Sequence, residues 1–357
     1  MKNFEYIFRS ELINNRIIKK YIVLSESEYS QNNPICLEKH LNWKYLSNPY
    51  GLSHAINGYL KDKLIGRISY QRKNFIFKNK LIKGANLCDL LIDKNHRNLE
   101  NFFKLTTPFF INNEIPGANI SIMIPNEISI NIYKNLLNLK PVGSLECRFF
   151  PIINSIVFNK LGIQIPNFIN KLFQKLLLFI NKNFQYILKI TFSNKTVGDE
   201  EYQKMIGTYY KDNLIQGERS KRWIEWRYSS QSTINYNLEY IFLNDNLIGY
   251  YSYRKTEKYG YKLLMIMEIV IIKKNIFIES SILLNLIYLA HKFNCDFILT
   301  LRSTQKNNPL SNLLFPKIPK FLFPTPLEFF VIKNGKTLPQ IFDVKNWKIN
   351  MADFDIF

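Results

Sequence analysis

Apolar and polar residues follow one another along the chain in short alternating runs and in longer stretches of helical spacing. Tyr59–Leu60 and Leu64–Tyr70 flank a polar turn and predict a strand hairpin, and Gly84–Ile92 predicts a buried strand. The remaining elements expected in the first half are helices at about 101–112 and 129–137 and strands at 119–124 and 146–153. Mixing of strands with helices in this order is typical of an α/β domain.

The second half repeats the first. Residues 62–70 and 245–253 share six of nine amino acids at an offset of 183, and Trp43 recurs as Trp226 at the same offset. The second half also predicts a hairpin around 244–246, a buried strand at 263–272, a helix at about 279–293 and strands at 295–301 and 328–332. One large repeat indicates two copies of a single domain rather than a solenoid.

We therefore expect a first domain over residues 1–153, a helical connector over 154–195 and a second domain over 196–357. Within the connector, residues 156–192 are rich in Leu, Ile, Phe and Lys, and the apolar residues between Phe168 and Ile180 have helical spacing. This helix either packs against the two domains or lies on an anionic membrane surface as a basic amphipathic segment.

Composition and residue spacing argue against a metal enzyme and a secreted protein. The formal net charge of +20 suits phosphate-bearing partners, although Lys, Asn, Ile, Phe and Tyr are also the residues of A+T-rich codons. The four cysteines and four histidines are scattered without metal-ligand spacing, so we expect free thiols and no metal. Charged residues precede any apolar run at the N-terminus, which predicts no signal peptide and a cytoplasmic protein.

Several motifs of the first copy recur in one known family. They are Trp43-Lys44-Tyr45 followed by Asn48-Pro49-Tyr50-Gly51, Asp89–Ile92 followed by His96-Arg97, and Pro125-Asn126-Glu127 followed by Tyr133; Asn346-Trp347 and Asp353-Phe354-Asp355 close the chain. The chain resembles tandem acyltransferases of the GCN5-related N-acetyltransferase (GNAT) family, found in bacterial surface-polysaccharide biosynthesis. The resemblance implies an α/β fold of two tandem GNAT-type domains, each a mixed, mostly antiparallel sheet flanked by helices.

The resemblance also implies a function. It is that of an acyl-CoA-dependent N- or O-acyltransferase, which transfers the acyl group directly from acetyl-CoA or another acyl-CoA to an amino sugar or a similar small acceptor, without a metal. The cofactor-binding residues that it implies are Leu90, Leu91, Ile92, Arg97, Asn98, Leu99 and Asn126. Backbone N–H groups and a helix N-terminus would hold the pyrophosphate there.

Three residues are candidates for catalysis by this resemblance. Tyr133 would protonate the leaving thiolate as a general acid, and Glu127 would accept a proton from the acceptor. Asp89 lies in an apolar strand, where burial would raise the pKa of its carboxyl and make it a candidate base, and Glu268 occupies the equivalent place in the second copy. Packing of Tyr133, a helix-dipole role of Glu127 and a structural hydrogen bond of Asp89 are the alternatives.

The chain departs from the family at the pyrophosphate loop. Glu100 stands where the family has its first glycine, and the second copy also lacks the glycines, which makes that copy degenerate. Two other functions therefore stay open. One is a Fem-type transferase that uses aminoacyl-tRNA, with RNA as partner, and the other is a catalytically degenerate GNAT pair that serves as a binding or scaffold protein.

Overall fold

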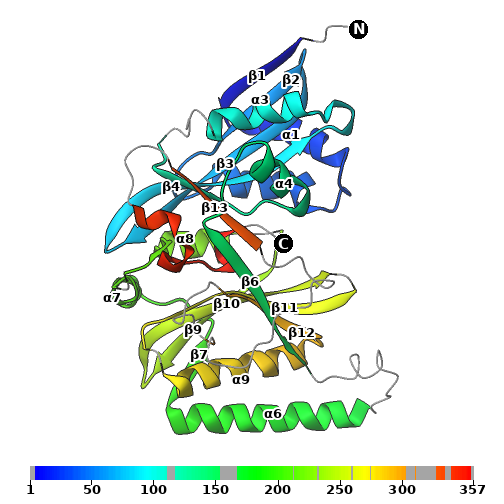
Figure 1. Ribbon diagram of the computed structural model, residues 1–357. Helices are drawn as coiled ribbons and strands as arrows, with labels where there is room; N and C mark the ends of the chain where they lie inside the picture. The colour runs from blue at the N-terminus through cyan, green and yellow to red at the C-terminus, as the bar shows by residue number, and fades with distance from the viewer. Residues whose placement is uncertain are drawn as a thin grey trace. The chain divides into compact units, whose positions relative to one another are not determined.

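The computed structural model describes residues 5–110, 117–152, 167–211, 213–230, 233–258, 260–273, 275–302, 310, 327–333 and 339–354 (Figure 1). The chain forms two compact units, and each takes segments from both halves of the sequence. Unit 1 consists of Met1–Gly143, Leu214–Ile234 and Glu328–Asn346, and unit 2 of Ser144–Asn213, Asn235–Leu327 and Trp347–Phe357.

Unit 1 is built on a mixed sheet in the order β1-β2-β3-β4-β5-β13. The strands are β1 (Tyr6–Leu12), β2 (His54–Leu60), β3 (Lys63–Phe77), β4 (Lys80–Ile92), β5 (Ile120–Met123) and β13 (Leu327–Lys333), and β8 (Ile215–Gly217) adds to β3. Neighbouring strands are antiparallel except β4 and β5, which are parallel. The sheet is thus mixed and mostly antiparallel, as the sequence predicts.

Helices cover both faces of this sheet. The helices are α1 (Asn15–Glu26), α2 (Glu38–Leu41), α3 (Leu99–Phe110), α4 (Glu127–Asn135) and α8 (Lys221–Ile224), with π-helical turns at Asn42–Leu46 and Glu225–Ser229 and 3₁₀ turns at Pro34–Cys36, Lys94–His96, Pro339–Phe342 and Val344–Asn346. Phe102, Leu105 and Phe109 of α3 pack on one face of the sheet, and Ile17 and Tyr21 of α1 pack on the other. The sheet therefore lies between two hydrophobic cores.

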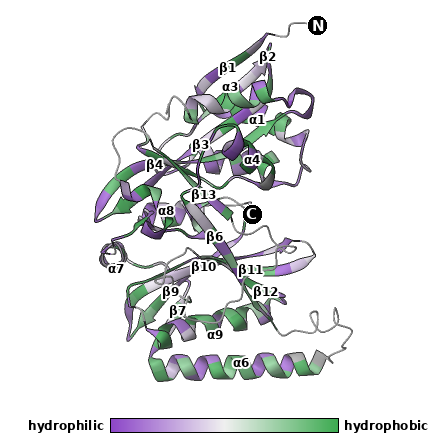
Figure 2. Ribbon diagram, viewed as in Figure 1, coloured by the Kyte–Doolittle hydropathy of each residue, from purple (hydrophilic) through white to green (hydrophobic). Residues whose placement is uncertain are grey.

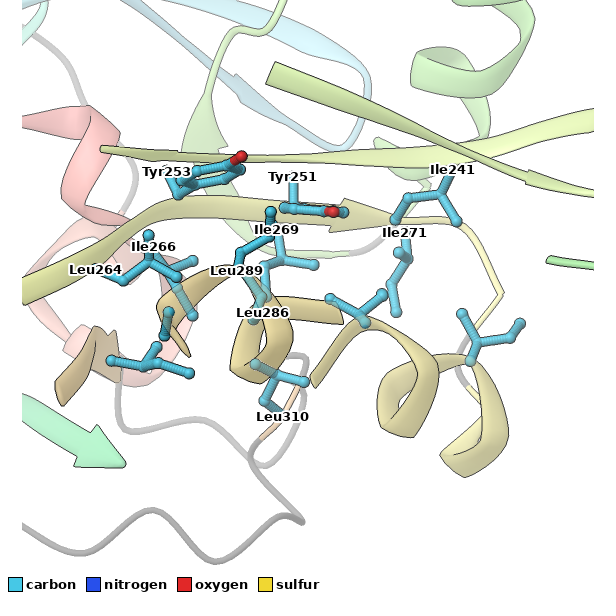
Figure 3. Close-up of a cluster of buried hydrophobic side chains, with 14 of the residues drawn as sticks. Ile241, Tyr251, Tyr253, Leu264, Ile266, Ile269, Ile271, Leu286, Leu289 and Leu310 are labelled. Atoms are coloured by element: carbon cyan, nitrogen blue, oxygen red, sulfur yellow. The ribbon is translucent and has the colours of Figure 1, made fainter. Parts of the chain in front are cut away.

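Unit 2 repeats this plan with the order β6-β12-β11-β10-β9-β7, in which only β11 and β12 are parallel. The elements are β6 (Gly143–Pro151), β7 (Ile190–Ser193), β9 (Tyr236–Leu243), β10 (Asn246–Lys258), β11 (Tyr261–Ile271), β12 (Phe297–Arg302), β14 (Trp347–Lys348), α6 (Asn167–Leu188), α7 (Asp199–Tyr209), α9 (Ile276–Lys292) and a 3₁₀ turn at Met351–Asp353. Its main core lies between the sheet and α9, where Leu286 and Leu289 meet Leu264, Ile266 and Ile269 (Figure 3).

The structure shows the repeat in detail. The two π-helical turns begin at Asn42 and Glu225, which are 183 residues apart, and a one-residue bulge falls at Ile65 in β3 and at Ile248 in β10. The last strand of each copy completes the sheet of the other unit, because β13 pairs with β5 and β6 pairs with β12. The compact units are therefore made of exchanged segments, while the boundaries at residues 153 and 195 remain a prediction about the repeat.

Candidate functional site

A bulge interrupts the unit 1 sheet near the end of β4. Arg67 of β3 pairs with Leu91 and Ser69 pairs with Cys88, so Ile68 alone faces both Asp89 and Leu90. Asp89 takes a φ of 54°, in the left-handed region that non-glycine residues seldom adopt. A bulge of this kind re-aims a side chain, and strained backbone of this kind is concentrated at functional sites.

The re-aimed side chain meets two residues of the π-helical turn at Asn42–Leu46. Lys44 Nζ lies 3.0 Å from Asp89 Oδ2 and 3.1 Å from Oδ1, and the Tyr45 hydroxyl donates a hydrogen bond to Oδ2. The side chains of Lys44 and Asp89 are only 4% and 13% exposed. The bulge and the turn thus assemble a buried ion pair with a phenol.

The expected raised pKa of Asp89 is wrong. Burial alone would raise it, but the charges of Lys44 and Arg67 and the hydrogen bonds from Tyr45 and Lys44 outweigh burial and lower the pKa of the Asp89 carboxyl. Burial, followed by the charge of Asp89, raises the pKa of Tyr45 well above its usual value. At neutral pH this site holds a carboxylate, an ammonium group and a neutral phenol.

Arg67 adds a second buried cation on the same side of the sheet. Its side chain is fully buried, its guanidinium lies 4.1 Å from the centroid of the Tyr21 ring, and Nη2 donates to Ser25 Oγ at 3.3 Å. Within the part of the chain that the structure describes, Nε and Nη1 of Arg67 have no hydrogen-bond partner. Together with Lys44, this residue makes the surroundings of Asp89 electropositive.

The bulge lies next to the place where two parallel strands part. β4 and β5 pair only at Gly84–Ile120, Ala85–Ser121 and Asn86–Ile122, and β4 then continues to Ile92. The candidate cofactor residues Leu90, Leu91 and Ile92 lie beyond this ladder. Leu90 and Ile92 pack toward α3, whereas Leu91 packs toward α1.

The loop before α3 carries the other candidate cofactor residues. Arg97 Nε donates to the Ile92 carbonyl at 2.9 Å, and Nη2 forms an ion pair with Glu28 Oε2 at 2.5 Å. Asn98 Oδ1 accepts from the Asn101 N–H at 2.8 Å and so caps the start of α3. Leu99 and Glu100 are exposed, and Glu100 pairs with Lys104 at 2.7 Å.

The remaining candidates lie in α4. Asn126 is the N-cap of this helix and accepts from the Ser129 N–H at 2.9 Å. Tyr133 is 3% exposed and packs against Phe102 and Phe110, with ring centroids 5.7 and 5.2 Å away. Burial raises the pKa of Tyr133, so its hydroxyl is protonated at neutral pH. The side chain of Glu127 lies outside the described residues.

The structure therefore brings Asp89 and Leu90–Ile92 together with the Arg97 loop, because Arg97 bonds to Ile92. Tyr133 enters the same core as Leu90 and Ile92 from the α3 side, whereas Asp89 meets Lys44 and Tyr45. Sequence reasoning gave no role to Lys44, Tyr45 or Arg67. The recurrence of Trp-Lys-Tyr as Trp-Arg-Tyr was the signal that could have drawn attention to the first two.

The two tryptophans of this repeat lie in unit 1 and contact each other. The rings of Trp43 and Trp226 stack with centroids 4.7 Å apart, and each indole N–H donates to the other residue's carbonyl, at 2.8 and 3.0 Å. Burial of both confirms that they are core residues. This reciprocal pair fixes the turn that carries Lys44 and Tyr45.

Comparison with solved structures gives the fold. A GCN5-related N-acetyltransferase from Anabaena variabilis superposes with a TM-score of 0.56 at 12% identity, over 91% of this chain and 72% of that chain. The fold is of the GNAT type. The predicted fold class is therefore confirmed.

Two further structures share this fold. The N-myristoyltransferase of Saccharomyces cerevisiae, with bound myristoyl-CoA, superposes with a TM-score of 0.55 at 12% identity, over 96% of this chain and 89% of that chain. A probable N-acyltransferase from Enterococcus faecalis superposes with a TM-score of 0.51 at 11% identity, over 92% of this chain and 71% of that chain. The sequence itself matches no family model and no curated protein.

Neither a membrane-spanning helix nor a metal-binding cluster occurs among the described residues. None of the helices in the described ranges has the length and apolar character needed to cross a bilayer. The described residues also contain no cluster of three or more His, Cys, Asp or Glu side chains that could hold a metal ion.

Proposed function

We propose that this protein is an acyltransferase that binds acyl-CoA in unit 1 and transfers the acyl group directly to an amino sugar or a similar small acceptor. The observation that carries the proposal is the bulge of β4 at Asp89, beside the point where the β4–β5 ladder ends at Asn86 and Ile122. Beyond that point, the backbone N–H and C=O groups of β4 that point away from β3 form no hydrogen bonds in the β4–β5 ladder. Such groups can polarise a thioester carbonyl and stabilise the oxyanion that forms on it.

The acceptor would attack this carbonyl, and CoA would leave as a thiolate. Tyr133 supports the proton transfer to the thiolate, because its phenol is neutral and has no hydrogen-bond partner among the described residues. Glu127 is the proposed acceptor of the proton from the attacking amine or hydroxyl. Asp89 is less suited to that task than the sequence suggested, because its lowered pKa makes it a weak base.

One feature favours an aminoacyl-RNA donor instead. Arg97 is bound to Glu28, and Asn98 caps α3, so the side chains of the loop that would cradle a pyrophosphate are already engaged. A donor carried on RNA would not need that cradle, and a net charge of +20 suits an RNA partner.

Calorimetry on the full chain separates these two donors. We expect acetyl-CoA or a longer acyl-CoA to bind, and a short aminoacyl-RNA mimic to show no saturable binding. Arg97→Gln should weaken acyl-CoA binding severalfold, because it removes a cation and frees the Ile92 carbonyl. The matched change Lys273→Gln, at the exposed equivalent loop of unit 2, should leave the affinity unchanged. Binding of the RNA mimic alone would reject the acyl-CoA proposal.

A further inference from the structure

Helix α6 belongs to unit 2 and turns amide side chains toward α9 of the same unit. Asn181 is 2% exposed and donates to Asn285 Oδ1 of α9 at 2.9 Å. Gln174 donates to the His291 carbonyl at 3.1 Å, and Gln185 donates to Asn181 Oδ1 at 2.9 Å. The inward face of α6 therefore combines these amides with half-buried apolar side chains such as Phe173, whose ring centroid lies 5.2 Å from that of His291.

The outward face of the same helix is apolar. Of the nineteen large apolar side chains exposed in the described residues, eight belong to α6. They include Phe168, Leu172, Leu176, Phe179, Tyr186 and Ile187, which are 50–84% exposed. Single exposed apolar side chains are normal on a surface, but a continuous stripe along one helix marks an interaction site.

The spacing shows that this stripe is continuous. Phe168, Leu172, Leu176 and Phe179 recur every three or four residues and so lie on one face of the helix. Figure 2 shows hydrophobic and hydrophilic residues alternating along α6, whereas α9 is mostly hydrophobic.

Positive charge runs beside the apolar stripe. Lys171, Lys175 and Lys182 are exposed and are separated by four and seven residues, which are about one and two helical turns, so they lie along one line beside the apolar set. The segment 167–188 contains no Asp or Glu. The surface that α6 presents is thus an apolar stripe bordered by lysines whose charge no acidic residue of the helix balances.

We propose that this face of α6 binds the surface of an anionic lipid bilayer. The apolar side chains would enter the boundary between headgroups and acyl chains, and the lysines would reach the lipid phosphates. A second copy of the chain fits less well, because a two-fold contact would bring the lysine stripes of both copies together without an acidic partner on either helix. The bilayer supplies both the apolar environment and the negative charge.

Sedimentation of the full chain with vesicles tests this proposal. Binding is expected to vesicles of phosphatidylcholine mixed with phosphatidylglycerol, and much less to phosphatidylcholine alone. The double variant Leu172→Gln, Phe179→Gln should lower the partition by about tenfold or more. The triple variant Lys171→Gln, Lys175→Gln, Lys182→Gln should lower the partition by about fivefold per lysine. Raised salt should lower the partition of the wild type in the same way, because it screens the lysine charges.

Two matched controls keep the test specific. Val23→Gln in α1 and Ile128→Gln in α4 remove exposed apolar side chains of unit 1 and should leave the partition onto anionic vesicles unchanged. Phe179→Trp should show a blue-shifted emission on anionic vesicles, whereas Val23→Trp should not. The proposal is overturned if the wild type ignores anionic vesicles or if the α6 variants bind as well as the controls. A dimer in light scattering that these variants turn into a monomer would also overturn it.

Discussion

A bulge interrupts β4 before α3 in unit 1 and β11 before α9 in unit 2, but the side chains around the two bulges differ. In unit 1 the bulge in β4 falls at Asp89, and Lys44, Tyr45 and the charge of Arg67 surround this carboxylate. In unit 2 the bulge in β11 falls at Met267, between the partners of Ser252 and Tyr253.

The counterparts in unit 2 are mostly aromatic. Glu268 accepts a hydrogen bond from Tyr250, the residue 183 positions after Arg67, at 3.1 Å. Tyr251 and Tyr253 (Figure 3) stand where unit 1 has Ile68 and Tyr70. Their rings stack on each other, and both hydroxyls donate to the Glu239 carboxylate. Both units also end the parallel ladder after three residue pairs. Duplication has therefore kept the bulge and the short parallel ladder in both units, whereas a tyrosine, Tyr250, replaces the buried Arg67 in unit 2.

The largest effect that this comparison predicts concerns the buried ion pair. Lys44→Met leaves the Asp89 carboxylate buried without its counter-ion and should lower the free energy of unfolding by about 3–5 kcal/mol. The matched change Tyr250→Phe in unit 2 removes one hydrogen bond to Glu268 and should cost about 1 kcal/mol. Urea unfolding measures both, and equal losses would contradict the proposed difference between the units.

The same ion pair predicts a dependence of stability on pH. The pKa of Asp89 is lowered in the folded state, so its contribution is present above the unfolded pKa of about 4 and is lost as the pH falls through the folded value. Asp89→Asn should be less stable than the wild type at neutral pH, and the gap should narrow as the solution is acidified. Thermal unfolding between neutral and acidic pH measures this gap, and a constant difference would show that the charge of Asp89 does not stabilise the fold.

A smaller effect is expected on catalysis. Tyr133→Phe keeps the ring between Phe102 and Phe110 but removes the proton donor, so turnover with acyl-CoA should fall by about 10- to 100-fold. The affinity for acyl-CoA and the stability should hardly change. Tyr250→Phe is the control in unit 2 and should leave turnover unchanged. Equal turnover in the wild type and Tyr133→Phe would remove Tyr133 from the mechanism.

The sequence predicted the fold well because its signals are local. The 3.6-residue and two-residue periodicities located α3, α9, β4 and β11, and the identical segments around Gly66 and Gly249 predicted equivalent hairpins. The exchange of the last strands and the stack of Trp43 on Trp226 depend on contacts between distant segments. No periodicity within one copy contains that information.

The site was predicted less well for an electrostatic reason. The apolar run around Asp89 correctly indicated burial, but the pKa of a buried carboxyl depends on which charges lie near it. Lys44 is 45 residues away in the sequence and reaches Asp89 only because the π-helical turn and the bulge face each other. The direction of the shift therefore needed the structure.

The smallest effect concerns Glu100 at the start of α3. A carboxylate near the pyrophosphate of acyl-CoA would cost about 1 kcal/mol at 4 Å in water-like surroundings. Glu100 is exposed and already paired with Lys104, so screening reduces this cost. Glu100→Gly should therefore tighten acetyl-CoA binding by about fivefold at most, through loss of the charge and closer approach of the backbone.

Glu100→Gln separates these two causes, because it removes the charge but keeps the side chain. If electrostatics dominates, Glu100→Gln should reproduce most of the tightening at low salt, and Lys104→Gln should weaken binding by freeing the carboxylate. If backbone approach dominates, only Glu100→Gly should tighten binding, and salt should matter little. Calorimetry with acetyl-CoA distinguishes the two patterns. Undetectable affinity in the wild type and in every variant would instead favour the aminoacyl-RNA donor or a binding function, because the α3 loop would then not be a pyrophosphate site.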